Sequence, residues 1–411
     1  MSTLRNYILV TAAYWAFTLT DGALRMLVLL HFYKLGYKPV ELAFLFLLYE
    51  FCGVVTNLGG AWIAARMGVN VTLTGGMALQ IVALVMLAFV NETWSAAASV
   101  AYVMASQALS GIAKDLTKMS SKSAIKVLLP DDAKSALFKW VAILTGSKNA
   151  LKGVGFFLGG WLLAIFGFVQ SLIAMAAGLA IVLVVLLLSL PREMGKAKSK
   201  SKFNAIFSKS REINVLSAAR FFLFGARDIW FVVAVPVFLS GLGWSFTQVG
   251  TFLALWVIGY GIVQSTVPAL LSGVIPQGQT AFTLAAILTV VAAGIPICLI
   301  AGFSPSLVVL TGLGLFGLVF AFNSSVHSYL ILAYSHGDKV VMNVGFYYMA
   351  NAGGRLIGTL LSGVMYQISG LMGCLWASVV FALSAALISM FLPNVESSKQ
   401  LAAFGIDAAS E

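Results

Sequence analysis

The sequence predicts an all-α polytopic membrane protein whose helices form two pseudo-symmetric six-helix halves. Of its 411 residues, 60% are hydrophobic and 9% are charged, whereas about a quarter of the residues of a soluble domain are charged. Apolar runs of about 20 residues, the length that spans a bilayer, recur along the whole chain. These runs are continuous rather than alternating, which predicts helices instead of barrel strands.

About twelve membrane spans are expected, and a polar segment rich in Lys and Ser divides them six and six. The expected spans are residues 6–32, 40–65, 70–90, 95–115, 137–166, 169–190, 214–240, 246–272, 280–302, 305–333, 340–367 and 371–393. In terms of domains, we expect an N-terminal half (1–191), a cytoplasmic basic linker (192–213), a C-terminal half (214–395) and a cytoplasmic tail (396–411).

The net charge of +11 follows the positive-inside rule. Lys and Arg collect in residues 114–126 and 191–212 and are scarce in the short loops between them. The rule therefore places these two segments and both termini in the cytoplasm. A solvated anchor explains the 191–212 run better than a nucleic-acid or lipid-headgroup site does, so no nucleic-acid partner is inferred.

Two sequence matches indicate an internal repeat. "LGYKPVELAF" (35–44) matches "LGWSFTQVGTF" (242–252), which aligns Asp21 with Asp228, and "KGVGFFLGG" (152–160) matches "RLIGTLLSG" (355–363), which aligns Lys152 with Arg355. Two matches at nearly one offset predict duplicated halves. Six plus six helices related in this way resemble the major facilitator superfamily, whose members bind substrate near the membrane midplane between the halves.

Two further patterns resemble superfamily motifs in part. The 59–70 loop keeps Arg66 and Gly68 but has Ala65 where the family usually has an acid. The glycines of the fifth span keep the spacing of the motif seen in proton-driven exporters, but Gly160 stands at its Pro position; these glycines are Gly146, Gly155 and Gly159. We expect the glycines at 153, 155, 159 and 160 to permit close helix packing rather than to contact ligand.

Charged residues deep in apolar spans are the candidates for function, because a cation at the bilayer centre costs roughly 2.5–3.5 kcal/mol. Lys148 and Lys152 lie roughly 10 and 17 Å into the fifth span at 1.5 Å per residue, and residues 145–161 contain no acid. Arg355 is placed similarly in the eleventh span. The other candidates are Asp21, Arg25, Glu50, Lys114, Asp115, Lys118, Arg227 and Asp228.

For part of this set a structural explanation competes with a functional one. Asp21 and Arg25 are spaced i,i+4 and could form an ion pair within one helix. Arg227 and Asp228 are adjacent, do not share a helix face, and would need partners from other helices.

Lys114 and Lys118 continue as Lys122 and Lys126 at every fourth position, so they could be a solvated cytoplasmic helix end. For Lys148, Lys152 and Arg355 too few acids remain. This shortage favours cations that face a water-filled cavity and bind an anionic substrate, since Arg and Lys suit phosphate-like groups.

Polar side chains would complete such a cavity. Tyr14 and Gln107 are offered by the first and fourth spans, and a stripe that recurs every four residues on the eleventh span leads to Arg355; its members are Asn343, Tyr347 and Asn351. Hydrogen bonds between helices are the alternative explanation of these groups. Asp21, Asp228 and Glu50 are the candidate proton carriers.

Two long stretches, "NYILVTAAYWAFTLTDGALRMLVLLHFYKLGY" (6–37) and "SQALSGIAKDLTKMSSKSAIK" (106–126), resemble the organoarsenical efflux permease family, ArsJ, a bacterial branch of the superfamily. The resemblance implies export of 1-arseno-3-phosphoglycerate across the bacterial inner membrane and hence arsenate resistance. It also implies a functional partner, glyceraldehyde-3-phosphate dehydrogenase, which makes that substrate. A dianion with an arsenate at one end and a phosphate at the other fits a cavity with excess cations.

The resulting hypothesis is a proton-coupled, monomeric antiporter that works by alternating access and needs no cofactor or metal. Lys148 and Lys152 would hold one end of the dianion, and Arg355 with Arg227 the other. A carrier of another organophosphate or organic anion is the alternative within transport. An integral-membrane enzyme acting on a lipid phosphate is disfavoured, because no nucleophile–base pair, metal cluster or phosphate-binding glycine loop is visible in the sequence.

Overall fold

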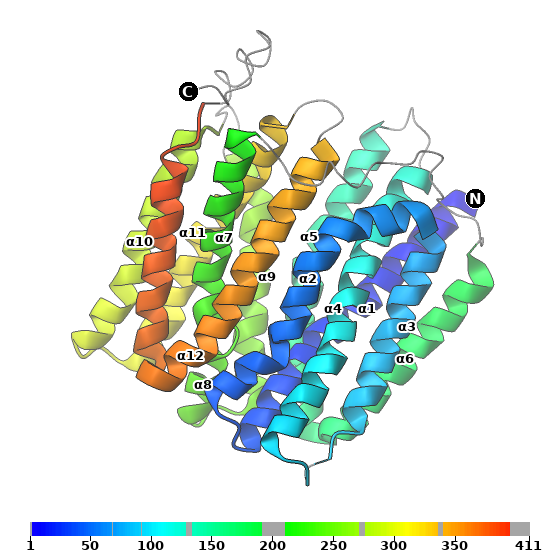
Figure 1. Cartoon of the computed structure of the whole chain (residues 1–411), viewed down its shortest axis with the longest axis horizontal. Helices are drawn as coiled ribbons and strands as arrows, with labels where there is room; N and C mark the ends of the chain where they lie inside the picture. Colours follow the sequence, from blue (N-terminus) through cyan, green and yellow to red (C-terminus); the bar gives the residue numbers. More distant parts are fainter. Residues whose placement is uncertain are drawn as a thin grey trace. The chain divides into compact units, whose positions relative to one another are not determined.

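The computed structural model describes residues 2–67, 69–91, 93–128, 134–190, 210–270, 276–335 and 340–394, and these ranges are almost entirely helical. Figure 1 shows the helices within these ranges. They are α1 (Ser2–Lys34), α2 (Pro39–Met67), α3 (Val69–Ala88), α4 (Ala96–Leu128), α5 (Lys134–Phe166), α6 (Phe168–Ser189), α7 (Arg211–Phe231), α8 (Ala234–Gly241), α9 (Phe246–Leu270), α10 (Gly278–Ile300), α11 (Pro305–Ala333) and α12 (Val340–Ser389).

The expected membrane spans are confirmed as helices. Ten stretches of the described chain are long and apolar enough to cross a membrane, and α7 with α8 counts as one of them, Arg211–Gly241. Helix α1 falls outside this set and carries Asp21 and Arg25 in its middle. Helix α12 contains the eleventh and twelfth expected spans in succession, because the chain turns back at Gly370 (Figure 1).

Gly370 makes this turn with φ 62° and ψ −157°, a conformation that glycine adopts readily because it has no Cβ. The seventh expected span, 214–240, is interrupted after Phe231 and resumes at Ala234. Helix α4 extends to Leu128, well past the expected end of its span at residue 115, since residues 116–128 contain neither Gly nor Pro and can continue the helix. The apolar run therefore indicated the membrane-crossing part of α4 and not the end of the helix.

The chain forms two compact units, which do not coincide with the predicted halves. The first consists of Met1–Tyr37, Phe44–Lys202 and Ser240–Ile258, and the second of Lys38–Ala43, Phe203–Leu239 and Gly259–Glu411. The first turn of α2 thus belongs to the second unit, and the first half of α9 belongs to the first. Most of the predicted linker (192–209) and the predicted tail (396–411) lie outside the described residues.

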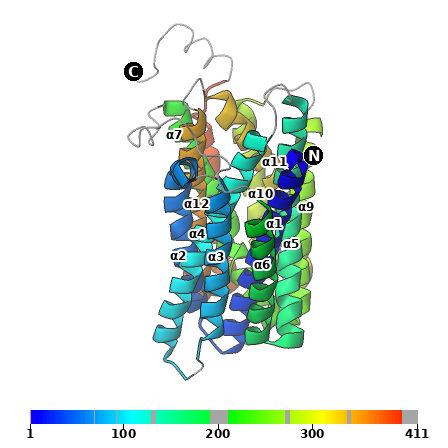
Figure 2. The same cartoon turned by 90° about the vertical axis from the view of Figure 1, so that its right-hand side faces the viewer.

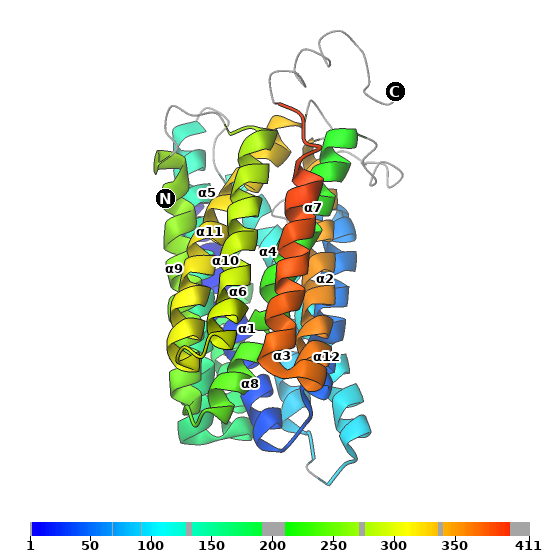
Figure 3. The same cartoon turned by 90° about the vertical axis from the view of Figure 1, so that its left-hand side faces the viewer.

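Within the first unit, α1 packs against α5, α4 and α6, and α3 packs against α4 and α6 (Figure 2). Within the second unit, α7 packs against α12, and α10 packs against α11 and α12 (Figure 3). Leu216 of α7 and Leu330 of α11 lie with Tyr347 of α12 in one buried apolar cluster of the second unit. In both units the first helix and the helix that carries Lys152 or Arg355 are therefore direct neighbours.

Candidate functional site

Asp21 and Arg25 lie in the middle of α1 and each contacts α2 rather than the other. The Tyr49 hydroxyl donates a hydrogen bond to Asp21 Oδ1 at 2.7 Å. The Arg25 guanidinium lies 2.7 Å from Glu50 Oε1, and these two side chains are 9% and 1% exposed. Of the two explanations left open for Asp21 and Arg25, the ion pair within α1 is not formed: the i,i+4 spacing permits it, but Glu50 on α2 binds the guanidinium instead.

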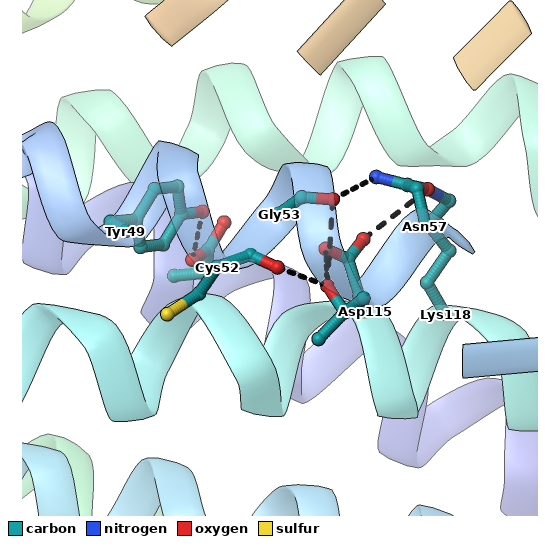
Figure 4. A network of polar contacts seen from close by, with 8 residues as sticks. Tyr49, Cys52, Gly53, Asn57, Asp115 and Lys118 are labelled. Carbon is teal, nitrogen blue, oxygen red and sulfur yellow. Dashed lines mark hydrogen bonds and ion pairs between the residues drawn. The ribbon is translucent and has the colours of Figure 1, made fainter. Parts of the chain in front are cut away.

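The polar part of α4 continues this network farther along α2 (Figure 4). Asp115 is fully buried and accepts hydrogen bonds from the Thr56 hydroxyl at 2.7 Å and from Lys118 Nζ at 3.3 Å. Lys118 Nζ also donates to Asn57 Oδ1 at 3.0 Å. Lys114 Nζ lies 4.1 Å from the centre of the Tyr49 ring, so the aromatic face of Tyr49 stabilises a cation while its hydroxyl binds a carboxylate.

Lys114 and Lys118 are not a solvated helix end, which corrects one of the two explanations above. The Lys118 side chain is 15% exposed, and the longer α4 buries this part of the stripe against α2. The side chains of Lys122 and Lys126 lie outside the described residues. Asp115 supplies the acid that the sequence argument had not assigned to these lysines.

Lys148 and Lys152 lie one turn apart on α5, and both are half-buried. Lys152 Nζ lies 5.5 Å from the centre of the Phe156 ring. A methyl group placed on Gly22 would lie 2.8 Å from the Lys152 carbonyl oxygen, so this lysine is level with Asp21 on α1. The functional role of both lysines stays a prediction.

The glycines of α5 allow two other helices to pack closely against it, which agrees with the packing role predicted for them. A methyl group on Gly155 would lie 2.6 Å from the Leu19 carbonyl oxygen of α1, and one on Gly160 would lie 2.5 Å from the Phe246 carbonyl oxygen of α9. Gly159 likewise meets α1, and Gly153 meets α9. Helix α5 is therefore held between α1 and α9 within the first unit.

The described polar network of the first unit carries more positive than negative charge. Its carboxylates are Asp21, Glu50 and Asp115, and its cations are Arg25, Lys114, Lys118, Lys148 and Lys152. The cations of this network therefore outnumber its carboxylates by two. The expected excess of cations is present in this unit, although pairing neutralises more of it than the sequence suggested.

In the second unit, Asp228 lies between two arginines. Its Oδ1 accepts a hydrogen bond from Arg227 Nε at 2.6 Å, and its Oδ2 accepts one from Arg355 Nε at 3.1 Å. The expectation that Arg227 must find its partner on another helix is wrong, because its long side chain curls back to the adjacent carboxylate. The expectation that Arg355 has no buried acid is also corrected, although Asp228 can neutralise only one of the two guanidinium charges.

The polar residues predicted to line the cavity are buried, but they lie in different units and do not form one cluster. Tyr14 and Gln107 are buried in the first unit, and Gln107 Nε2 has no hydrogen-bond partner among the described residues. Asn351 is buried in the second unit. Asn343 donates to Ser335 Oγ at 3.3 Å, so for this residue the hydrogen bond between helices is the correct explanation. Tyr347 lies in the apolar cluster of the second unit.

Three buried polar groups were missed by the sequence reasoning. Tyr49 was not singled out because a tyrosine in an apolar span gives no signal of what its hydroxyl meets. Arg220 of α7 and His327 of α11 are both buried; Arg220 could have been found, since it is a further cation within an expected span. The side chains of Arg66 and Ala65 lie outside the described ones, so the 59–70 loop motif stays a prediction.

Within the described ranges, no three His, Cys, Asp or Glu side chains come together in a way that could hold a metal ion. Cys52, Cys298 and Cys374 are free cysteines. The networks around Asp21 and Asp228 therefore offer charge and hydrogen bonds. They suit recognition of a charged solute and movement of protons.

Comparison with known proteins agrees with this architecture. A sequence profile described as "Major Facilitator Superfamily" matches residues 7–336. The fold is similar to that of a point mutant of the nucleoside transporter NupG, with a TM-score of 0.70 and 14% identity over 97% of this chain and 100% of that one. It is also similar to a POT family transporter in complex with 5-aminolevulinic acid, with a TM-score of 0.72 and 14% identity over 96% of each chain. No curated protein sequence matches the chain.

Proposed function

Because the chain belongs to the major facilitator superfamily, and is thus a multi-pass membrane transporter rather than an enzyme, we propose that it exports an organoarsenical dianion. The proposed substrate is 1-arseno-3-phosphoglycerate, made in the cytoplasm with the help of glyceraldehyde-3-phosphate dehydrogenase, and its removal confers resistance to arsenate. The proposed location is the bacterial inner membrane, with both termini in the cytoplasm, and the proposed working form is a monomer.

The observation that carries this proposal is the excess of buried and half-buried cations over carboxylates in each unit. In the first unit, the network contains five cations and three carboxylates. In the second unit, Asp228 is shared by Arg227 and Arg355. Charge in a membrane-embedded site is costly, and a dianionic solute would balance the excess of positive charge. A substrate with an anionic group at each end suits a protein with basic groups in both of its units.

The roles follow from the positions of these side chains. Lys148 and Lys152 bind one anionic group as point charges, and Arg355 with Arg227 binds the other, where the planar guanidinium allows two parallel hydrogen bonds. Lys114, Lys118 and Arg25 add to the positive field of the first unit. Tyr14, Gln107, Tyr347 and Asn351 supply the neutral hydrogen-bonding groups proposed for the substrate.

Coupling to protons is assigned to the buried carboxylates. Asp21, Glu50 and Asp228 each contact a hydroxyl or a guanidinium whose partner would change when the carboxylate is protonated. A substrate anion that draws Arg355 away would leave Asp228 with one cation fewer and favour its protonation. Export by alternating access would then be driven by the inward proton gradient, as in transporters built from two repeated halves.

The proposal is tested by arsenate resistance in bacterial cells that also express the dehydrogenase. Lys152→Ala and Arg355→Ala are expected to abolish resistance at unchanged membrane abundance, whereas Lys34→Gln, which changes an exposed cation at the end of α1, leaves it intact. Undiminished resistance in both alanine variants would overturn the assignment.

The substrate itself is tested by withholding the dehydrogenase. Resistance that disappears without this enzyme and returns with it identifies the arsenylated product as the exported solute. Resistance that does not depend on the enzyme favours the alternative, a carrier of another organophosphate or organic anion. Uptake of the arsenylated compound into inverted vesicles, with and without a pH gradient, then measures the coupling directly.

A further inference from the structure

A second polar cluster lies within the second unit, where α7, α11 and α12 meet. Its centre is Arg220, which is 3% exposed. The guanidinium lies over the ring of Phe224 at 4.0 Å and over that of Tyr347 at 5.0 Å. Its Nη1 atom donates to the Ser324 carbonyl oxygen at 3.4 Å, which is long for a hydrogen bond.

Arg220 forms no ion pair with an acid in the described part of the chain, and its Nε has no hydrogen-bond partner there. A guanidinium has five N–H donors and stays charged in proteins. Burying such a charge without an acidic partner is costly, and the contacts with two aromatic faces offset only part of that cost. The site is therefore incomplete as a purely structural arrangement.

Two neighbouring groups have the same deficit. Neither ring nitrogen of His327 is hydrogen-bonded within the described residues, and the Tyr347 hydroxyl makes no hydrogen bond of good geometry there, although both residues are fully buried. His327 lies one turn beyond Ser324 on α11, and the Ser324 carbonyl oxygen accepts from Arg220. The Tyr347 hydroxyl lies near Ser328 of the same helix. More than nine in ten buried polar groups have a partner, so three unsatisfied groups from three helices at one place call for a ligand.

The α11 side of this cluster is fixed in position by α9. The hydroxyl of Tyr260 and the amide of Gln264 contact Ser324 Oγ at 3.1 Å and 3.2 Å, and Ser325 Oγ donates to the Gln264 carbonyl oxygen at 2.9 Å. These contacts occupy the Ser324 side chain and hold its carbonyl toward Arg220. The groups left unsatisfied around Arg220 are thus held on a rigid frame, which is what a preorganised binding site needs.

The chemistry of the unsatisfied groups selects the ligand. A permanent cation, an imidazole N–H and a phenolic hydroxyl can all donate to the oxygens of a carboxylate or a phosphoryl group, and Arg pairs with such planar or tetrahedral oxyanions through two parallel bonds. We propose that Arg220, His327 and Tyr347 bind an oxyanion group of the transported substrate. This inference rests on the proposed function in treating the bound oxyanion as part of the transported solute.

Tyr347→Phe separates this role from a structural one. The ring over Arg220 is kept and only the hydroxyl is lost. Because its neighbour Ser328 already donates its own hydroxyl to the Ser324 carbonyl oxygen, we expect the thermal unfolding midpoint to change little. If the hydroxyl binds an oxyanion, affinity falls by about 10-fold or more, since a hydrogen bond to a charged group is worth about 1.5–3 kcal/mol. Arg220→Lys keeps the positive charge but removes the planar guanidinium, which can donate two parallel hydrogen bonds. We expect a similar loss of affinity for the oxyanion.

The test uses the full chain in lipid nanodiscs and titration calorimetry with three probes. These are 3-phosphoglycerate, inorganic phosphate and glycerate, which separate a phosphoryl from a carboxylate preference. Arg211→Gln, which changes an exposed arginine at the start of the same helix α7, is the matched control and is expected to bind each probe like the unmodified chain.

Weaker binding by Tyr347→Phe and Arg220→Lys, with an unchanged unfolding midpoint for Tyr347→Phe, supports the site. Unchanged affinity in both variants, or no binding of any probe by the unmodified chain, overturns it. If Arg220→Lys fails to fold, Tyr347→Phe still decides. The two proposals can fail separately. If the variants weaken oxyanion binding but cells gain no arsenate resistance, the site is supported and the proposed organoarsenical substrate is rejected.

Discussion

Arg355 Nε lies 3.1 Å from Asp228 Oδ2. Arg355 is the cation that the internal repeat aligns with Lys152, and it is thus paired with a carboxylate of its own unit. The same carboxylate also holds Arg227. One buried acid thus serves two half-buried guanidinium groups, and it is the least replaceable member of the three.

Asp228→Asn should therefore destabilise the protein strongly. Breaking a buried ion pair by removing one partner costs about 3–5 kcal/mol, because the remaining charge is left buried. We expect a lower thermal unfolding midpoint in detergent and lower membrane abundance. Adding Arg355→Gln to this variant removes one of the stranded charges, so the double variant should recover part of the loss. A double variant less stable than Asp228→Asn alone would contradict the pairing.

The pair between Arg25 and Glu50 predicts the same pattern in the first unit. Either Arg25→Gln or Glu50→Gln leaves one buried charge without its partner and should lower the unfolding midpoint. Arg25→Gln/Glu50→Gln replaces both charges with neutral amides that can still hydrogen-bond, and it should be more stable than at least one of the single variants. Strictly additive losses in this double-mutant cycle would show that the two residues are not coupled.

These two ion pairs show how much of the fold and of the candidate site the sequence predicts. The presence of the helices follows from apolar length alone, because a bilayer requires about 20 apolar residues per crossing. Asp228 and Arg355 were recognised as misplaced charges for the same reason. Their contact was not predicted, because 127 residues separate them and neither residue type specifies which helix it will face.

Arg25 shows the opposite failure. Its i,i+4 spacing from Asp21 is a real local preference, worth about 0.2–0.5 kcal/mol, and packing overrides it easily. Glu50 on α2 offers a buried partner at 2.7 Å, where a charge-assisted hydrogen bond is worth more than the local pair. The end of α4 was predicted wrongly for a similar reason. Hydropathy indicates where a helix leaves the membrane, whereas backbone propensity decides where the helix itself ends.

The two contacts of Tyr49 can be tested separately, because its hydroxyl binds the Asp21 carboxylate and its ring lies against cations. Tyr49→Phe removes the hydrogen bond to Asp21 and should cost about 1–3 kcal/mol, since it leaves a buried carboxylate without that donor. Tyr49→Leu also removes the ring that lies 4.1 Å from Lys114 Nζ and should lower the unfolding midpoint further. The order of the two midpoints is the measurement, and equal values would show that the ring does not stabilise the lysine.

The contact between α1 and α5 gives the last prediction. A methyl group on Gly155 would lie 2.6 Å from the Leu19 carbonyl oxygen and 3.0 Å from Gly22 Cα. Both are backbone atoms and cannot rotate away, so Gly155→Ala must push the helices apart. Overpacking of this kind costs about 1–3 kcal/mol, and it would also move Lys152 away from the level of Asp21. We expect lower stability together with weaker transport.

Gly178 on α6 is the matched control for this change. Nothing lies within 4 Å of a methyl group placed there, so Gly178→Ala should gain the helix propensity of alanine, about 1 kcal/mol, without a clash. The two variants carry the same chemical change on two membrane-spanning helices, and their unfolding midpoints should move in opposite directions. A Gly155→Ala variant as stable as Gly178→Ala would show that α1 and α5 are not packed as closely as the structure places them.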